Sequence, residues 1–538
     1  MILILEILNK DTPLDPSSAP HTDFEDNSVN TQSMKAKSFR FIPKHSLAVM
    51  FQAAKLSLVS HVSDKVIGDF LKMEHNKIRN LAKDFNFNSD QILNNIPVTR
   101  STVMRRLGFD VKLKESVCCP ECFKLYPIPD DENLDENTKQ RAEEKKKQAA
   151  EGKIKSKFDG IPKKCTGIWY STSKMYVQRA EGDGIGKCDA SLFQSEWKKG
   201  HEEPHRIFRY ETLKNWLGNK LCMVGFEDLL IANLKENNTS GRMSDVWDGS
   251  VWRNFEAPEG SSLPYTKVEG NLVFSLYVDW FNPHGNKVGG KAFSVGLVAL
   301  VCLNIPMNQR YLPENIYVFG IIPGPKEPKG TEMDYVLEPL IEEFLEFWDG
   351  VWFTETAKFP RGRKIRAVIF PLIGDLPAMR KVAGFSSHSA TLFCSYCELP
   401  INEINSLDKK KWPPRTHEKH IQAVAEWESC KTSWEQDEVT KQKGVRSSIL
   451  NKLPYWRPIE YSIIELMHGL ILGNLKDHSW TYLNTGWAGE KLKNLIKKEK
   501  NLKKENDESV FAGIFSEPGI KRKNRTEEST AGEIAELS

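Results

Sequence analysis

Three acidic residues, far apart in the sequence, stand where they could do chemistry. Asp279 follows the apolar run Leu272 to Val278, and Asp375 ends the similar run KIRAVIFPLIGD. Glu465 lies three residues before His468 in EYSIIELMHGLILGN, where apolar residues recur at helical spacing. We predict two acids at strand ends and a third on a helix whose apolar stripe docks against the sheet. Carboxylates from separate elements are the hard oxygen ligands that Mg²⁺ or Mn²⁺ needs for phosphodiester chemistry.

The segments between these acids predict the elements that must position them. After the strand that carries Asp279 come two apolar runs, KAFSVGLVALVCLNI and IYVFGIIPG, then the helical segment DYVLEPLIEEFLEFWDG, then the strand that carries Asp375. Strand, strand, strand, helix, strand is the order of an RNase H-like domain, in which the first and fourth strands are neighbours. We therefore predict an α/β fold: an RNase H-like mixed sheet with flanking helices and an insertion, about residues 398–450, before the third acid.

A set of short motifs, in this order, resembles the catalytic region of CACTA-type (En/Spm-like) DNA transposases. The motifs are VDWFNPHG, IPGPKEP, LEPLIEEFLEFWDGV, GDLPAMRKVAGFSSHSA, CSYC and IELMHGLILG, and the resemblance spans residues 271–478. It implies that Asp279, Asp375 and Glu465 are catalytic and hold Mg²⁺ or Mn²⁺. It also implies cleavage of element ends, strand transfer into target DNA, and, as partners, the element's terminal repeats, target DNA and further copies of the chain.

The chain departs from that family at three points. Trp280 replaces the usual small residue after the first acid, Glu465 stands where Asp is frequent, and a charged ending follows soon after the third acid. The short ending favours an alternative: a truncated or domesticated transposase-derived protein that binds DNA without cutting it. The intact acids favour a cutting enzyme.

Two groups of cysteines have metal-ligand spacing. Cys119 and Cys122 form a CxxC pair with single cysteines at Cys165 and Cys188, and a tetrahedral zinc site needs four such ligands. Reduced thiols without metal are the alternative, and the adjacent Cys118 is a spare or alternative ligand. The second CxxC pair consists of Cys394 and Cys397. Together with His468, and with His388 as a further candidate, this pair could hold zinc in the insertion.

Composition limits the cellular setting. No apolar run approaches the roughly 20 residues of a membrane span, so we expect no membrane partner. The chain has 75 basic and 72 acidic side chains, so any DNA binding must come from local patches. Together with the resemblance to transposases, these features predict a nuclear protein.

The predicted organisation has six parts. In the helical region, residues 39–112, three arginines could contact DNA or could belong to an ordinary helical scaffold. They are Arg100, Arg105 and Arg106. The parts are a disordered leader (1–38), a helical region (39–112), a cysteine region (113–195), a helical connector (196–258), the catalytic domain (259–483) and a charged disordered tail (484–538).

Overall fold

A computed structural model describes most of the chain between residues 28 and 475. The described ranges are 28–31, 42–58, 62–107, 111–129, 158, 160–169, 186–194, 203–235, 243–256, 258, 263–283 and 293–475. The predicted tail, 484–538, lies outside the described residues. No helix of the described part is both long enough and apolar enough to cross a membrane.

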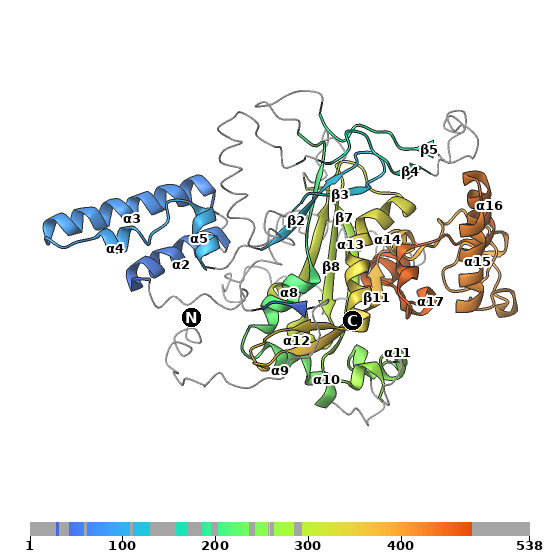
Figure 1. Ribbon diagram of the computed structural model, residues 1–538. Coiled ribbons are helices and arrows are strands. Elements are labelled where there is room, and N and C mark those ends of the chain that lie inside the picture. Colours follow the sequence, from blue (N-terminus) through green and yellow to red (C-terminus); the bar gives the residue numbers. More distant parts are fainter. Residues whose placement is uncertain are drawn as a thin grey trace, which may run out of the picture.

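A mixed sheet forms the centre of the structure (Figure 1). Its middle strands are β7 (Asn271–Phe281), β8 (Val295–Cys302), β9 (Ile316–Ile322), β11 (Arg363–Gly374) and the short β12 (Ser462–Ile464). The strands β7, β8 and β9 are antiparallel neighbours, whereas β11 runs parallel to β7 and β12 runs parallel to β11. The spatial order is therefore β9, β8, β7, β11, β12. The predicted strand order is present, and the first and fourth strands are adjacent.

Helices cover one face of this sheet. The long helix α13 (Gly330–Asp349) packs there, with Phe344 at 5.9 Å from Phe274 of β7 between ring centroids, and α14 (Leu376–Ala383) follows β11 directly. The apolar residues of α13 recur every three or four residues, which buries one side of the helix against the strands. These residues are Met333, Val336, Leu337, Leu340, Ile341, Phe344 and Phe347. The other face of the sheet is covered by aromatic side chains packed on Phe370, namely Trp252, Phe255 and Tyr461.

The sheet continues beyond β9 into the parts predicted as a cysteine region and a helical connector. Here β6 (Ile207–Glu211) pairs with β9, β2 (Leu113–Cys118) pairs with β6, and β3 (Leu125–Pro127) pairs with β2. A strand thus lies where the connector was predicted to be helical. The alternating pattern of the segment IFRYE, with Phe208 and Tyr210 buried, is the local signal for it.

The leader is not wholly without structure. Within the predicted disordered segment, β1 (Ser28–Val29) pairs in parallel with β10 (Val351–Phe353) at the far edge of the sheet. Thr31 is fully buried, and its hydroxyl donates to the carbonyl of Glu355 at 2.5 Å. The expectation for residues 28–31 was therefore wrong, because a few backbone pairings with a distant strand leave no periodic pattern in the sequence.

The N-terminal helices form a unit with a core of their own (Figure 1). The unit consists of α2 (Lys44–Leu58), α3 (Asp64–Asp84), α4 (Asp90–Leu93) and α5 (Arg100–Leu107). Its buried residues include Val49, Met50, Ala53, Ile67, Leu71, Ile78, Ile96, Val103, Met104 and Leu107.

The remaining elements are short, apart from a helical pair in the insertion. That pair is α15 (His417–Ser429) and α16 (Ser433–Lys443), each beginning at a threonine cap. The other α-helices and strands are α8 (Leu213–Leu221), α9 (Phe226–Leu230), α10 (Ala232–Lys235), α11 (Ser250–Asn254), α12 (Met307–Arg310), α17 (Pro458–Tyr461), and the strand pair β4 (Ile168–Trp169) and β5 (Gly186–Lys187). A π-helix (Met467–Leu475) is the last element of the described residues.

Candidate active site and metal centre

The register of the parallel strands brings the two aspartates level with each other. Ile373 of β11 pairs with Tyr277 of β7. Two residues further along each strand stand Asp375 and Asp279, so both carboxylates emerge from the same face at neighbouring strand ends. Adjacent strands lie about 4.8 Å apart, so these two acids are neighbours at one edge of the sheet.

Glu465 joins the same row from the next strand. Gly374 pairs with Ile464, and the backbone N–H of Glu465 donates to the carbonyl of Gly374 at 2.9 Å. Glu465 therefore stands beside Asp375, on the side away from Asp279. The structure brings together the three acids that the sequence singles out, in one row across β7, β11 and β12.

Glu465 does not lie on a helix, contrary to the sequence-based expectation. It follows β12 because residues 462–464 use their backbone groups to extend the sheet, and the π-helix begins only at Met467. In this segment Ile464 is half-buried against the main core, but the apolar side chains around it do not dock against the sheet: six of them are at least 42% exposed. They are Ile463, Leu466, Met467, Leu470, Ile471 and Leu475.

The electrostatics show that the acids act on one another. Partial burial raises the pKa of Asp279, and the carboxylates of Asp375 and Glu465 raise that pKa further, against a lowering by the backbone N–H of Trp280. A hydrogen bond to Glu465 raises the pKa of His468, and the charges of Asp375 and Asp279 add to the rise. Neighbouring like charges of this kind favour a bound cation, which would stabilise the ionised carboxylates.

Asp375 has a second contact that fixes its position. It is the N-cap of α14, and its Oδ1 accepts a hydrogen bond from the N–H of Ala378 at 2.7 Å. From the same helix, Lys381 lies 4.0 Å above the ring of Trp280, the neighbour of Asp279, and pairs with Glu327 at 2.9 Å. The helix that holds one aspartate thus also packs on the strand that holds the other.

A second site lies near the other end of the sheet, where four cysteines meet. One sulfur from each of Cys119, Cys122, Cys165 and Cys188 lies within 4.8 Å of the others, so the cluster could hold a metal ion. The Cys122 to Cys165 and Cys119 to Cys188 sulfur distances are 3.4 and 3.7 Å. Sulfurs around a tetrahedral zinc ion, each about 2.3 Å from it, would be about 3.8 Å apart. The donor set and its spacing therefore fit zinc.

Two residues that the sequence analysis did not single out complete this cluster. The hydroxyl of Tyr126 and the N–H of Gly167 donate to the sulfur of Cys165, at 3.2 and 3.3 Å. A Cβ at Gly167 would lie 2.8 Å from the sulfur of Cys122, so the cluster requires a residue without a side chain here. In the sequence, the signal that could have identified Gly167 is its position two residues after Cys165, a predicted ligand.

Cys118 is a core residue and lies outside the cluster. Its side chain is fully buried in the main hydrophobic core, and its thiol donates to the carbonyls of Cys119 and Phe123. Burial raises the pKa of Cys118 to about 12, which keeps it a neutral thiol. It is not the spare ligand that the sequence allowed.

The second CxxC pair is not joined by its predicted histidine. His468 is bonded to Glu465 in the acid row instead. Among the residues that the structure describes, the four-cysteine cluster is the group of His, Cys, Asp or Glu found with metal-ligand spacing, and Cys394 and Cys397 are not part of one. The sequence could not exclude a zinc site made of Cys394, Cys397 and His468, because His468 belongs to the motif that follows the CxxC pair. In the structure, His468 follows β12, and this strand places it beside the acids.

Two further acids upstream are structural. Asp245 accepts two hydrogen bonds, at 2.7 and 2.8 Å, from the guanidinium of Arg310, whose side chain is almost fully buried and also donates to the carbonyl of Ile305. Asp248 caps the turn that follows Asp245. Neither residue therefore belongs to the acid row.

The protein is thus an α/β protein with a row of three acids on one sheet and a cysteine cluster able to hold a metal ion. Residues 240–448 match the family model described as transposase family tnp2. This match supports a transposase, a nucleic-acid-processing enzyme, and it implies DNA binding. It covers Asp279 and Asp375 and ends before Glu465. No curated protein gives a significant match to the chain.

Proposed function

We propose that the chain is a DDE-type DNA transposase of the CACTA group, with an RNase H-like catalytic domain, that cuts element ends and joins them to target DNA. The observation that carries the proposal is the row of Asp279, Asp375 and Glu465 at the ends of three adjacent parallel strands. The order β9, β8, β7, β11, β12 supports the RNase H-like assignment. Such a protein would work in the nucleus.

The three carboxylates would hold Mg²⁺ or Mn²⁺ and provide the oxygen ligands that these ions prefer. When bound, the metal would activate water and stabilise charge on the phosphate. The protein's own part is to hold the carboxylates in place: Asp375 through its cap on α14, Glu465 through the carbonyl of Gly374, and Asp279 through the N–H of Trp280. His468 keeps Glu465 directed by a hydrogen bond to its side chain.

The four cysteines would hold a structural zinc ion. They are fully or largely buried, and the turn from Cys119 to Cys122 directs two backbone N–H groups, those of Glu121 and Cys122, at the sulfur of Cys119. Such a site contributes folding energy rather than chemistry. Because β2 and β3 belong to the central sheet, zinc here would stabilise the edge of the catalytic fold.

Cleavage of a labelled element end tests the proposal. The substrate is a duplex that carries the inverted repeat flanking the gene, incubated with the purified protein and Mg²⁺ or Mn²⁺. We expect strand cleavage that leaves a free 3′-hydroxyl and that Asp279→Asn abolishes. A matched control, Asp228→Asn, removes an acid whose side chain is 65% exposed and paired with Lys358, and should cut normally.

Two outcomes would count against the proposal. If the unaltered protein binds the duplex but never cuts it with either metal, a non-cutting descendant of a transposase becomes the better hypothesis. If Asp279→Asn and Asp228→Asn cut equally well, the acid row is not the catalytic site.

A further inference from the structure

We infer that the outward face of α3, in the N-terminal helical unit, binds the phosphate backbone of duplex DNA. This surface lies outside the matched residues 240–448. The inference rests on the proposed function in taking DNA as the partner, and it adds where that partner is held. We call this surface the α3 face; its cations are Lys65, Lys72, Arg79 and Lys83, and its amide is Asn76.

The α3 face is a single row along the helix. Its five residues are separated by seven, four, three and four positions in the sequence, so all five lie on the same side of the helix. All five side chains are exposed. The buried residues Ile67, Leu71, Glu74 and Ile78 occupy the opposite side. From Lys65 to Lys83 the row is about 27 Å long at 1.5 Å per residue. That length corresponds to about eight base pairs of duplex.

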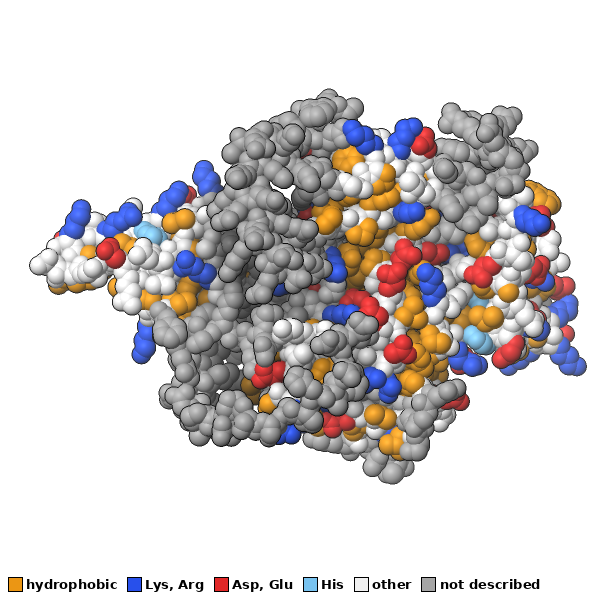
Figure 2. Space-filling view, in the orientation of Figure 1, with side chains coloured by type: hydrophobic (Ala, Val, Ile, Leu, Met, Phe, Trp, Pro, Cys, Tyr) orange, Lys and Arg blue, Asp and Glu red, His pale blue; other side chains and the backbone are white. Residues whose placement is uncertain are grey.

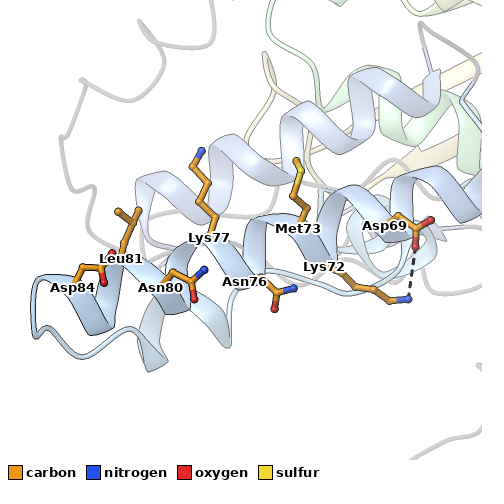
Figure 3. Close-up of a pocket in the computed structure, with 8 residues that line it drawn as sticks. All are labelled: Asp69, Lys72, Met73, Asn76, Lys77, Asn80, Leu81 and Asp84. Carbon is orange, nitrogen blue, oxygen red and sulfur yellow. Dashed lines mark ion pairs between the residues drawn. The ribbon is translucent and has the colours of Figure 1, made fainter.

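The cations of this row are largely unengaged within the described part of the chain. Lys72 has an acidic neighbour, Asp69, at 3.8 Å, in an exposed pair of little energetic value. Arg79 contacts only the amide of Asn76, at 3.4 Å. Lys72 and Asn76 line a surface hollow of about 620 Å³ on the same helix, together with residues that include Asp69 and Asp84. Figure 3 shows these side chains on α3. The side chains can therefore turn toward an approaching phosphate.

The arginines of α5, to which the sequence drew attention, are engaged in the unit itself. Arg100 donates to the hydroxyl of Ser57 and lies 3.5 Å from Asp64, and Arg106 donates to the carbonyl of Asn95 at 2.9 Å. These contacts hold α5 to the rest of the unit. The side chain of Arg105 is outside the described residues. The contacts of Arg100 and Arg106 agree with the scaffold alternative for α5, and the cations of α3 are the ones left available for a phosphate.

The distribution of charge favours a polyanion. Residues 42–107 contain ten Lys and Arg against five Asp and Glu, a net charge of +5, whereas the whole chain has only +3. Figure 2 shows blue side chains along this unit, which projects from the sheet. A local basic surface on a protein of nearly balanced charge is the arrangement that sequence-independent phosphate binding needs.

Salt dependence of DNA binding by the full chain tests the inference. The probe is a fluorescent 30-base-pair duplex of arbitrary sequence, and anisotropy is measured between 50 and 200 mM salt without added divalent metal. The test variant is Lys72→Gln with Arg79→Gln. The control, Lys44→Gln with Lys55→Gln, removes the same charge from exposed positions of α2 in the same unit. Circular dichroism should show equal helix content in both variants.

Each phosphate contact contributes about 0.9 to the slope of log affinity against log salt. The test variant should therefore lose about 1.8 from the slope. A fourfold rise in salt should then weaken the unaltered protein about twelvefold more than the test variant. The control should keep the slope of the unaltered protein.

Three results would overturn the inference. The first is that the unaltered protein does not bind the duplex, and the second is that the test variant keeps the salt slope unchanged. The third is that the test and control variants lose the same amount from the slope, which would indicate a diffuse electrostatic field rather than a binding face. If the test variant keeps its slope while element ends are still cut in a manner that requires Asp279, the inference fails and the proposed function stands.

Discussion

Asp375 has two roles that substitution can separate. Its Oδ1 accepts from the N–H of Ala378 as the N-cap of α14, and its carboxylate stands in the acid row between those of Asp279 and Glu465. Asparagine caps helices about as well as aspartate but has no charge for a metal ion, whereas alanine has neither property. The pair Asp375→Asn and Asp375→Ala therefore distinguishes capping from catalysis.

The stability of the two variants should differ. Asp375→Asn keeps the cap and loses the favourable interaction of a negative charge with the helix dipole, about 0.3 to 1 kcal/mol, while it relieves the repulsion between Asp375 and Asp279. Asp375→Ala also loses the cap, which costs about 1 kcal/mol more, within a range of about 0.5 to 2. Chemical denaturation measures both differences. An asparagine variant as unstable as the alanine variant would contradict the capping argument.

The activity of the two variants should not differ. A ligand to a catalytic metal contributes several kcal/mol to stabilising the transition state, so both variants should cut element ends at least about 10³-fold more slowly. DNA binding should be unchanged in both, since a carboxylate repels phosphate rather than binding it. The assay is single-turnover cleavage with Mg²⁺ at saturating protein. Cleavage by Asp375→Asn within tenfold of the unaltered rate would refute the assignment of Asp375 as a metal ligand.

Further predictions concern the cysteine cluster and two buried acids. Purified protein should contain zinc in a near-integral amount, and Gly167→Ala should release it faster to a chelator, because the new methyl group would press on the sulfur of Cys122; folded protein free of zinc would contradict this. Burial raises the pKa of Glu343 from 4.5 to about 7, so its contribution to stability is present below pH 4.5 and is lost as the pH rises through about 7. Between pH 4.5 and about 7, the free energy of unfolding of the unaltered protein should therefore fall by up to about 3 kcal/mol relative to that of Glu343→Gln. If the thermal stabilities of the two proteins change in parallel with pH, the effect is absent. Asp245→Ala should cost about 3 to 5 kcal/mol, since it leaves the guanidinium of Arg310 buried without its partner, and a loss below about 1 kcal/mol in denaturant would show that the pair is not needed.

The sequence by itself determined the features that depend on local pattern. The apolar runs before Asp279 and Asp375 specify strands that end near these acids, because a buried strand is a short apolar run that closes with turn-forming residues. The order of such runs predicted the order of the central strands. Cysteine spacing likewise indicated the four residues of the cluster, since thiols in metal sites recur in close pairs.

The tertiary structure alone decided where the third acid stands and what the single residues touch. The segment before Glu465 has a helical pattern, yet its pairing with β11 makes it a strand, because backbone hydrogen bonds to a distant strand outweigh a weak local preference. The same pairing takes His468 to the acids and away from the second CxxC pair. Whether Cys118 faces the cluster or the core, and whether the cations of α3 or those of α5 are free, depends on packing between distant segments, which sequence spacing does not record.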